Sequence, residues 1–293
     1  MGKSREIKKR MKAVGNIRRI TKTMQMIATS KFARAQQRAV ASKPYTNAMF
    51  DLVAKLASAA GDVSHPLIDA KPGPNAKALT LVITSDRGLC GPYNGAILRK
   101  MMEHFRASAE AREGVIELVG KKGLATLKFN KIPVATHHTH FGDKPSYADV
   151  EKLAQTYIDR FAKGEISSVT VISMRFISAG KQVPEVRRLL PFVAAEVASA
   201  DESKKDANLP FEFSPSPREL MDTLLPAALK ASLFQAFNDA IVSEHIARMV
   251  AMKAATDNAG KMGKRLSRAY NRARQAQITT ELTEIISGAA ALG

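Results

Sequence analysis

The sequence of 293 residues carries 45 Lys and Arg against 27 Asp and Glu, and this net charge of +18 predicts an anionic partner: nucleic acid, an anionic membrane surface or an acidic protein. Its one cysteine, Cys90, excludes an intrachain disulfide and fits a reducing compartment, while no apolar run reaches the roughly 18 residues that a membrane-spanning helix needs. Aromatic residues make up 6% of the chain and Trp is absent, which favours helix-on-helix packing over an aromatic-rich β core.

Residues 3–58 predict one long amphipathic helix. Between Lys3 and Arg38 there are twelve basic residues and a single acidic one, Glu6. Pro44 should kink this helix or mark a joint, because proline lacks a backbone N–H and clashes with the preceding turn. Apolar residues recur at spacings of three and four, which predicts one buried helix face. The residues of that face are Ile7, Met11, Val14, Ile17, Ile20, Met24 and Ile27.

The middle of the chain predicts a small α/β domain with a mostly parallel sheet, because strands alternate with helices there. A linker rich in Gly and Pro at residues 61–78 precedes it, and residues 198–208 are small, charged and polar, which indicates a loop. The predicted strands are residues 78–84, 115–119, 132–136, 168–176 and an antiparallel 184–192, and the predicted helices are residues 94–112, 121–129 and 147–162.

Residues 217–293 predict a second and longer helix. Ser216 is the expected N-cap, with Pro217 at the first helical position and Glu219 in the capping-box position. No proline follows Pro226, and about 70 helical residues would extend roughly 100 Å, so the helix needs a partner along most of its length. A coiled-coil-like stripe consists of Leu266, Tyr270, Ala273, Gln277, Ile278, Leu282, Ile285 and Ala289, and a seam of small residues consists of Ala247, Ala251, Ala254, Ala255 and Ala259.

The economical arrangement pairs the two long helices as an antiparallel coiled coil. The predicted fold is therefore α/β plus coiled coil, with long antiparallel N- and C-terminal helices and an inserted Rossmann-like α/β domain. Residues 261–274 carry six basic side chains and no acidic one, which indicates either a solvated face or a surface surrounded by acidic partners. The predicted divisions are residues 1–60 and 217–293 for the two helices, 76–197 for the α/β domain and 198–216 for a loop.

Catalytic chemistry has little support in the sequence. The turn at residues 85–94 follows a strand, where a doubly wound sheet places its ligand, but its glycines form neither a dinucleotide fingerprint nor a phosphate-binding loop. Asp86 and Arg87 either pin this turn or bind a partner. We expect no enzyme activity, cofactor or metal. The remaining candidates, which we interpret as inert packing or an exposed polar edge, are Cys90, His137, His138 and His140.

Four stretches are more specific than helical periodicity requires. Residues 20–31 read ITKTMQMIATSK, residues 85–91 read SDRGLCG with Asn94 close behind, residues 243–259 read SEHIARMVAMKAATDNA, and residues 273–285 read ARQAQITTELTEI. In this order they resemble the N-terminal, central and C-terminal signatures of the gamma subunit of rotary F-type ATP synthases of the bacterial type. The resemblance spans the whole chain.

The resemblance implies a non-catalytic subunit of a proton-translocating ATP synthase. The coiled coil would be the central rotor shaft inside the ring of alpha and beta subunits, and the α/β domain would be the foot next to the epsilon subunit and the membrane c-ring. The shaft would couple proton-driven rotation of the membrane ring to ATP synthesis or hydrolysis on the surrounding subunits. The chain would lie peripherally on the cytoplasmic face of the bacterial inner membrane, without nucleic acid and without a transmembrane span.

Position in the motifs also implies partner-binding residues. Met24 and Lys31 would lie near an acidic lever of the beta subunit. The other candidates for contact with partners are Asp86, Arg87, Arg248, Arg274, Gln275, Thr279 and Glu281. From the residues alone, a basic coiled-coil nucleic-acid-binding protein remains the alternative, because it too explains the charge, although sparse aromatics and the lack of a docking motif count against it.

Overall fold

Two long helices, α1 (Gly2–Ala59) and α8 (Pro217–Ala290), dominate the computed structural model. The chain divides into two compact units: a hairpin unit of Met1–Ser30 with Arg248–Gly293, and an α/β unit of Lys31–Ala247. Both long helices therefore contribute residues to each unit. The residues that the structure describes are 2–59, 65–69, 72–192 and 216–290.

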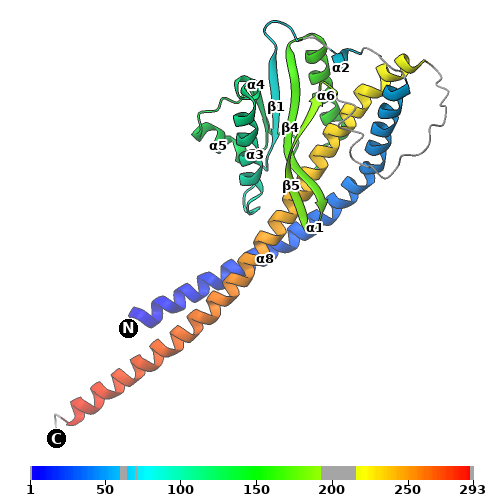
Figure 1. Ribbon diagram of the computed structural model, residues 1–293. Helices are drawn as coiled ribbons and strands as arrows, with labels where there is room; N and C mark the ends of the chain where they lie inside the picture. The colour runs from blue at the N-terminus through cyan, green and yellow to red at the C-terminus, as the bar shows by residue number, and fades with distance from the viewer. Residues whose placement is uncertain (1, 60–64, 70–71, 193–215, 291–293) are drawn as a thin grey trace. The chain divides into compact units, whose positions relative to one another are not determined.

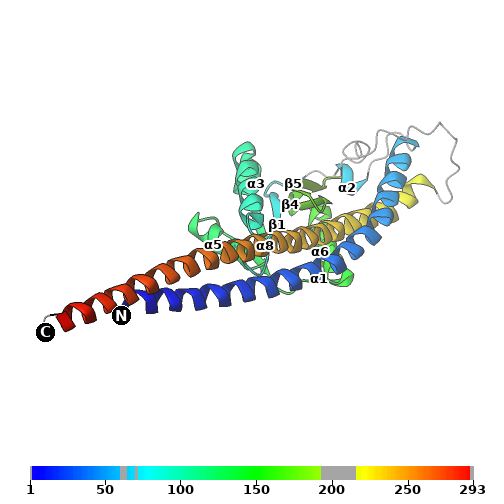
Figure 2. The same ribbon diagram turned by 90° about the horizontal axis from the view of Figure 1, so that it is seen from below.

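In the hairpin unit, α1 and α8 run antiparallel and side by side (Figure 1, Figure 2). Ser4 Oγ donates a hydrogen bond to Gln277 Oε1 at 3.0 Å, and Thr256 Oγ1 donates one to Thr21 Oγ1 at 2.8 Å. Residues early in α1 thus meet residues late in α8. The predicted fold class, an antiparallel coiled coil with an inserted α/β domain, is confirmed.

The buried seam of α1 in this unit follows a seven-residue repeat and contains small side chains. The prediction of the buried face was therefore wrong in part, since Ile17, Ile20 and Ile27 are 52%, 56% and 52% exposed. A prediction from apolar spacing alone cannot distinguish a buried isoleucine from an exposed one. In the structure the seam contains Thr and Ala, whose small side chains let two helices approach closely. The seam residues, half-buried at the first position and buried at the others, are Ile7, Val14, Thr21 and Ala28.

The facing seam of α8 also alternates spacings of four and three. Of the predicted small seam, Ala259 is buried but Ala254 is exposed, because it lies two positions from each of the neighbouring seam residues Met252 and Thr256. Beyond Gln277, every residue from Ile278 to Ala290 is exposed, so among the described residues of this unit no helix covers the predicted stripe after that point. The half-buried or buried seam residues are Met252, Thr256, Ala259, Gly263, Leu266, Tyr270, Ala273 and Gln277.

The hairpin unit holds most of the charge of the protein. Seventeen Lys or Arg and four Asp or Glu fall in residues 1–30 and 248–293, which gives this unit +13 of the total +18. All six basic residues of the block at 261–274 are exposed. The pair of helices therefore presents a basic surface around a small, nearly uncharged seam.

The α/β unit is built on a five-stranded sheet in the order β3-β2-β1-β4-β5. Strand β1 pairs in parallel with both β2 and β4, β2 pairs in parallel with β3, and β5 runs antiparallel to β4. The strands are β1 (Lys77–Ile83), β2 (Val115–Val119), β3 (Thr136–His138), β4 (Ile166–Ser178) and β5 (Lys181–Leu190). The helices are α2 (Pro66–Asp69), α3 (Tyr93–Ala107), α4 (Ala109–Glu113), α5 (Lys122–Phe129) and α6 (Tyr147–Ala162).

Helices cover both faces of the sheet (Figure 1). On β1, Leu79 and Leu81 belong to a core shared with α6 and with the parts of α1 and α8 that lie in this unit. Val82 belongs to the opposite core, which includes Ile97 of α3 and Leu127 of α5. Alternation along one buried strand thus builds two cores, as expected for a mainly parallel sheet covered on both faces.

Several predicted boundaries need correction. The third strand is Thr136–His138 rather than 132–136, and the helix predicted at 94–112 is interrupted at Ser108, whose hydroxyl caps α4. Helix α1 continues through Pro44.

At the start of α8, Ser216 Oγ accepts a hydrogen bond from Glu219 N at 3.5 Å, in the place predicted for the N-cap. The predicted loop at 198–208 and most of the division at 198–216 lie outside the described residues, as does part of the linker at 61–78.

Candidate partner-binding site

The end of α8 carries four of the candidate residues, all exposed. Their side-chain hydrogen bonds stay within the helix: Thr279 Oγ1 donates to the carbonyl of Gln275 at 3.0 Å, and Gln277 Nε2 donates to Glu281 Oε1 at 2.8 Å. Contiguous exposed aliphatic side chains on one helix mark an interaction surface. The four candidates are Arg274, Gln275, Thr279 and Glu281, and the exposed aliphatics between and beyond them are Ile278, Leu282, Ile285 and Ile286, at 49%, 53%, 68% and 66%.

Two more candidates, Met24 and Arg248, are half-buried in the hairpin unit. Met24 shares a face of α1 with Ile20 and Ile27, which are four and three positions away, respectively. This face is apolar and more than half exposed at Ile20 and Ile27. It therefore presents a second aliphatic surface to a partner.

The turn after β1 is held by its own side chains. Ser85 N donates to Asn94 Oδ1 at 3.0 Å, and Asn94 Nδ2 donates to Ser85 Oγ at 2.8 Å and to Cys90 Sγ at 3.3 Å. Cys90 is buried, as the packing interpretation expects. Among the glycines of this turn, Gly91 has φ +56, and the non-glycine Leu89 adopts φ +63 with its side chain 59% exposed. The turn is therefore a rigid loop that displays Leu89.

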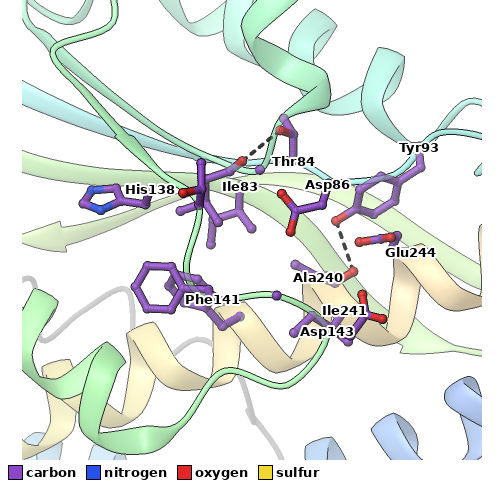
Figure 3. A pocket seen from close by; sticks show the side chains of 15 residues that line it. Ile83, Thr84, Asp86, Tyr93, His138, Phe141, Asp143, Ala240, Ile241 and Glu244 are labelled. Carbon is purple, nitrogen blue, oxygen red and sulfur yellow. Dashed lines mark hydrogen bonds between the residues drawn. The ribbon is translucent and has the colours of Figure 1, made fainter.

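Asp86 points from this turn into a cavity of about 20 Å³ at the carboxyl ends of β1, β2 and β3 (Figure 3). Tyr93, Asp143 and Glu244 also line it, and Tyr93 Oη donates to the carbonyl of Ala240 at 3.1 Å. Asp86 Oδ1 is buried without a hydrogen-bond partner among the described residues. A cavity of this size has room for about one water molecule, so it does not accommodate a nucleotide.

Arg87, beside Asp86, is exposed. The sequence did not single out Asp143 or Glu244. Asp143 follows the third parallel strand, and this placement was a usable signal because parallel strands end at one edge of a sheet. Glu244 reaches the cavity from α8, and only the tertiary fold brings it there.

Lys31 already has a partner within the α/β unit, because its ammonium donates to the carboxylate of Asp143. The two side chains are 37% and 34% exposed. Burial by itself would raise the pKa of Asp143, but the hydrogen bond and the charge of Lys31 outweigh burial and hold this pKa below its usual value. A partner carboxylate that approached Lys31 would therefore compete with Asp143.

A buried carboxylate, Glu117 of β2, is surrounded by three donors. Tyr157 Oη donates to Glu117 at 2.8 Å, His138 Nε2 lies 2.8 Å from the same oxygen, and Arg160 is 3.4 Å from the other. Burial would raise the pKa of Glu117, but the hydrogen bonds from His138 and Tyr157 lower it overall. Burial and the neighbouring carboxylate raise the pKa of Tyr157 well above its ordinary value. This network ties β2 and β3 to α6.

The other two candidate histidines, His137 and His140, show no metal-binding arrangement with the described residues around them. His137 Nε2 lies 2.9 Å from a backbone carbonyl oxygen, and His140 is exposed, with its ring tilted against that of Phe141 at 4.1 Å between the ring centroids. Within the described ranges, no group of three His, Cys, Asp or Glu side chains could hold a metal ion. Over the same ranges, none of the helices combines the length and apolar character needed to cross a bilayer.

The nine candidate residues fall into two groups. Lys31, Asp86 and Arg87 belong to the α/β unit, near the carboxyl ends of its parallel strands. The other six lie in the hairpin unit, four of them on the exposed end of α8. Their role in binding partners stays a prediction.

Comparisons with known proteins agree over the full length. The profile of the family described as "ATP synthase" matches residues 3–292. The "ATP synthase gamma chain" of Rhodopirellula baltica is 42% identical, and the match covers 100% of this chain and 99% of that protein. The "ATP synthase gamma chain" of Leptospira biflexa is 38% identical, with 100% of both chains covered.

Two solved structures share the fold. A chain of the mitochondrial ATP synthase of Euglena gracilis, from the structure of OSCP, F1 and c-ring in rotational state 3, has a TM-score of 0.67 at 20% identity, covering 99% of this chain and 95% of that one. A chain of the rotor of the same enzyme, in rotational state 1, has a TM-score of 0.61 at 18% identity, covering 94% and 99%. At these identities the likeness is one of fold.

The hairpin unit is an antiparallel helical pair with exposed basic and aliphatic residues, and the second unit is an α/β domain. Together they define a coiled-coil protein that acts by contact with other chains. The match of the family profile and of full-length relatives makes the assignment specific. The chain belongs to the ATP synthase gamma chain family.

Proposed function

We propose that this chain is the central rotor shaft of an F-type ATP synthase, coupling proton-driven rotation of a membrane ring to ATP synthesis or hydrolysis on surrounding subunits. The observation that carries the proposal is the end of α8. From Ile278 to Ala290 the helix continues past its pairing with α1, and every residue there is exposed. Its aliphatic side chains are buried only if other chains surround them, as the ring of alpha and beta subunits does in this proposal.

The charge of the hairpin unit supports the same role. A net +13 on two paired helices suits acidic loops on the surrounding subunits. Exposed ion pairs contribute only about 0.2–1 kcal/mol each. Many weak pairs spread over the surface hold the shaft in place without a single contact strong enough to stop its rotation.

The chain is a non-catalytic subunit in this mechanism. It changes the conformational equilibria of the beta subunits, and so couples its own orientation to their nucleotide affinity. The α/β unit is the foot, in contact with the epsilon subunit and the membrane c-ring. The chain is part of the central stalk, peripheral to the membrane sector, and lies on the cytoplasmic face of the bacterial inner membrane.

The candidate residues take specific roles in this proposal. Met24 and Lys31 meet an acidic lever of the beta subunit, and Asp86 and Arg87 contact partners from the turn after β1. Five residues meet loops of the surrounding ring: Arg248, Arg274, Gln275, Thr279 and Glu281. The exposure of the last four supports this assignment, as does the exposed apolar face beside Met24. The divisions at 1–60, 76–197, 198–216 and 217–293 separate shaft, foot and connecting loop.

The test is gentle co-purification of the tagged full chain from the membrane fraction of its own cells. We expect recovery with several copies of two larger nucleotide-binding subunits and with magnesium-dependent ATP hydrolysis. Recovery of the chain alone, or with nucleic acid and without ATP hydrolysis, would overturn the proposal in favour of a basic coiled-coil nucleic-acid-binding protein. Nuclease treatment before elution removes recovery that depends on bridging nucleic acid.

A further inference from the structure

A groove lies between α3 and α5 on the side of the sheet opposite α6. It is open to solvent and has a volume of about 700 Å³. Leu98 and Met102 form an apolar floor, buried and half-buried respectively. The walls include Arg99, Glu103, Arg106, Lys122, Thr126 and Asn130.

The rims of the groove are basic. Arg99 and Arg106 stand on the α3 rim and Lys122 on the α5 rim, all exposed. Within the part of the chain that the structure describes, these three side chains have no hydrogen bond or ion pair, whereas the one acidic lining residue, Glu103, lies 3.3 Å from Lys100. Among the described residues of the α/β unit, no side chain pairs with the positive charge of these three groups.

One large exposed apolar residue directly precedes a residue that lines the groove. Phe129, the last residue of α5, is 86% exposed, the highest value among the exposed large hydrophobic residues of the described chain. It precedes the lining residue Asn130, whose side chain donates to the carbonyl of Thr126 at 2.8 Å. Exposed aromatic and methionine side chains next to arginines are typical of protein-binding surfaces.

A small phosphate ligand fits this site poorly. Phosphate sites at helix N-termini use free backbone N–H groups. At the start of α5 those donors are occupied, since Lys122 N donates to the carbonyl of Ser85 at 2.9 Å and Gly123 N donates to Thr84 Oγ1 at 3.2 Å. The basic side chains line two rims instead of converging on one point, which suits an elongated acidic partner.

We propose that the groove between α3 and α5 binds an acidic segment of another protein subunit, with at least one apolar side chain on the Leu98 and Met102 floor. The inference rests on the proposed function, because that subunit is a member of the same complex. Carboxylates of the segment pair with Arg99, Arg106 and Lys122. Its apolar residues cover the floor and Phe129.

The test places a photo-crosslinking amino acid, p-benzoylphenylalanine, in the groove of the full chain within the purified complex. Thr126 is the probe position, and Thr156 on α6 is the matched control, because both are exposed threonines on helices of the α/β unit. We expect the Thr126 probe to crosslink a segment of another subunit that contains both Asp or Glu and aliphatic residues. A crosslink no stronger than that from Thr156, or one to lipid, nucleic acid or a segment without carboxylates, would overturn the proposal.

Charge reversal supplies the second measurement. In the same complex, Arg99→Glu combined with Lys122→Glu should reduce the Thr126 crosslink by about threefold or more, since two exposed ion pairs are replaced by repulsion. Lys152→Glu, an exposed reversal on α6, should leave the crosslink unchanged. Unchanged crosslinking in the double variant would contradict the inference. Copurification with ATP hydrolysis reports separately on the proposed function, so a complex that forms without a groove crosslink rejects only the inference.

Discussion

Replacement of Ala28 by leucine tests the seven-residue repeat of the hairpin unit. Ala28 is 1% exposed and lies one repeat after Thr21 in the buried seam of α1. Leucine adds three carbon atoms where the facing helix leaves space for a methyl group. Overpacking of this kind costs about 1–3 kcal/mol, because the helices must separate or the side chain must leave its preferred rotamer.

The same substitution at Ala13 is the matched control. Ala13 lies on the same helix and in the same unit, but it is exposed. Surface substitutions usually change stability by no more than about 0.5 kcal/mol. Ala13→Leu should therefore leave the hairpin unit almost unchanged, although the chemical change is identical.

Native-state hydrogen exchange is the suitable assay, since it reports local opening in a chain of two units. A cost of about 1–3 kcal/mol corresponds to amide exchange about 5- to 150-fold faster around residue 28 in Ala28→Leu. Equal exchange in the two variants, or faster exchange in Ala13→Leu, would show that this repeat is not the buried seam. The original apolar spacing, with Ile17, Ile20 and Ile27 inside, would then be the better description.

Three further predictions concern the end of α8 and the α/β unit. Removal of the residues after Ala276 should weaken assembly or coupling while ATP hydrolysis continues, and full proton-driven ATP synthesis in membranes with the truncated chain would contradict the role given to this end. Asp143→Asn should cost at most about 1 kcal/mol at neutral pH, because the pair with Lys31 is partly exposed. Since the pKa of Asp143 is lowered in the folded chain, that contribution is present above the ordinary value of 3.8 and is lost as pH falls through the lower folded value. Urea titrations should therefore show the difference between wild type and variant shrinking in acid, and a difference independent of pH would argue against the ion pair. Glu117→Gln should destabilise the α/β unit by about 3 kcal/mol in urea unfolding, because its buried partners lose the carboxylate. Glu113→Gln, at an exposed position, should change little, and an equal effect of both would refute the importance of burial.

The strands and helices that the sequence predicted well have strong local signals. Strand β2 is apolar at every position except Glu117, and its observed bounds coincide with the prediction, as do those of α6 with its regular apolar face. The third strand was misplaced because Ile132 and Val134 are apolar, but they pack against the core beside α3 and α5. The backbone first bonds to β2 at Ala135, whose N–H donates to the carbonyl of Ile116 at 2.8 Å, and the paired residues begin at Thr136.

The buried face of α1 and the cavity beside Asp86 were harder to predict for different reasons. Threonine and alanine at Thr21 and Ala28 carry little hydrophobic signal, although their small size suits close helix packing. At the cavity, Asp86, Asp143 and Glu244 come from positions far apart in the chain. Their proximity depends on the order of the parallel strands and on where α8 packs, which no local pattern contains.

The seven-residue repeat has a mechanical consequence. A repeat of 3.5 residues per turn is shorter than the 3.6 of a straight helix, so a pair that keeps its seam buried must coil to the left. Torque applied in the sense of that winding tightens the pair, whereas torque in the opposite sense loosens it. Torque in the two directions therefore acts differently on the hairpin unit, and among the described residues beyond Gln277 the end of α8 has no second helix to share that torque.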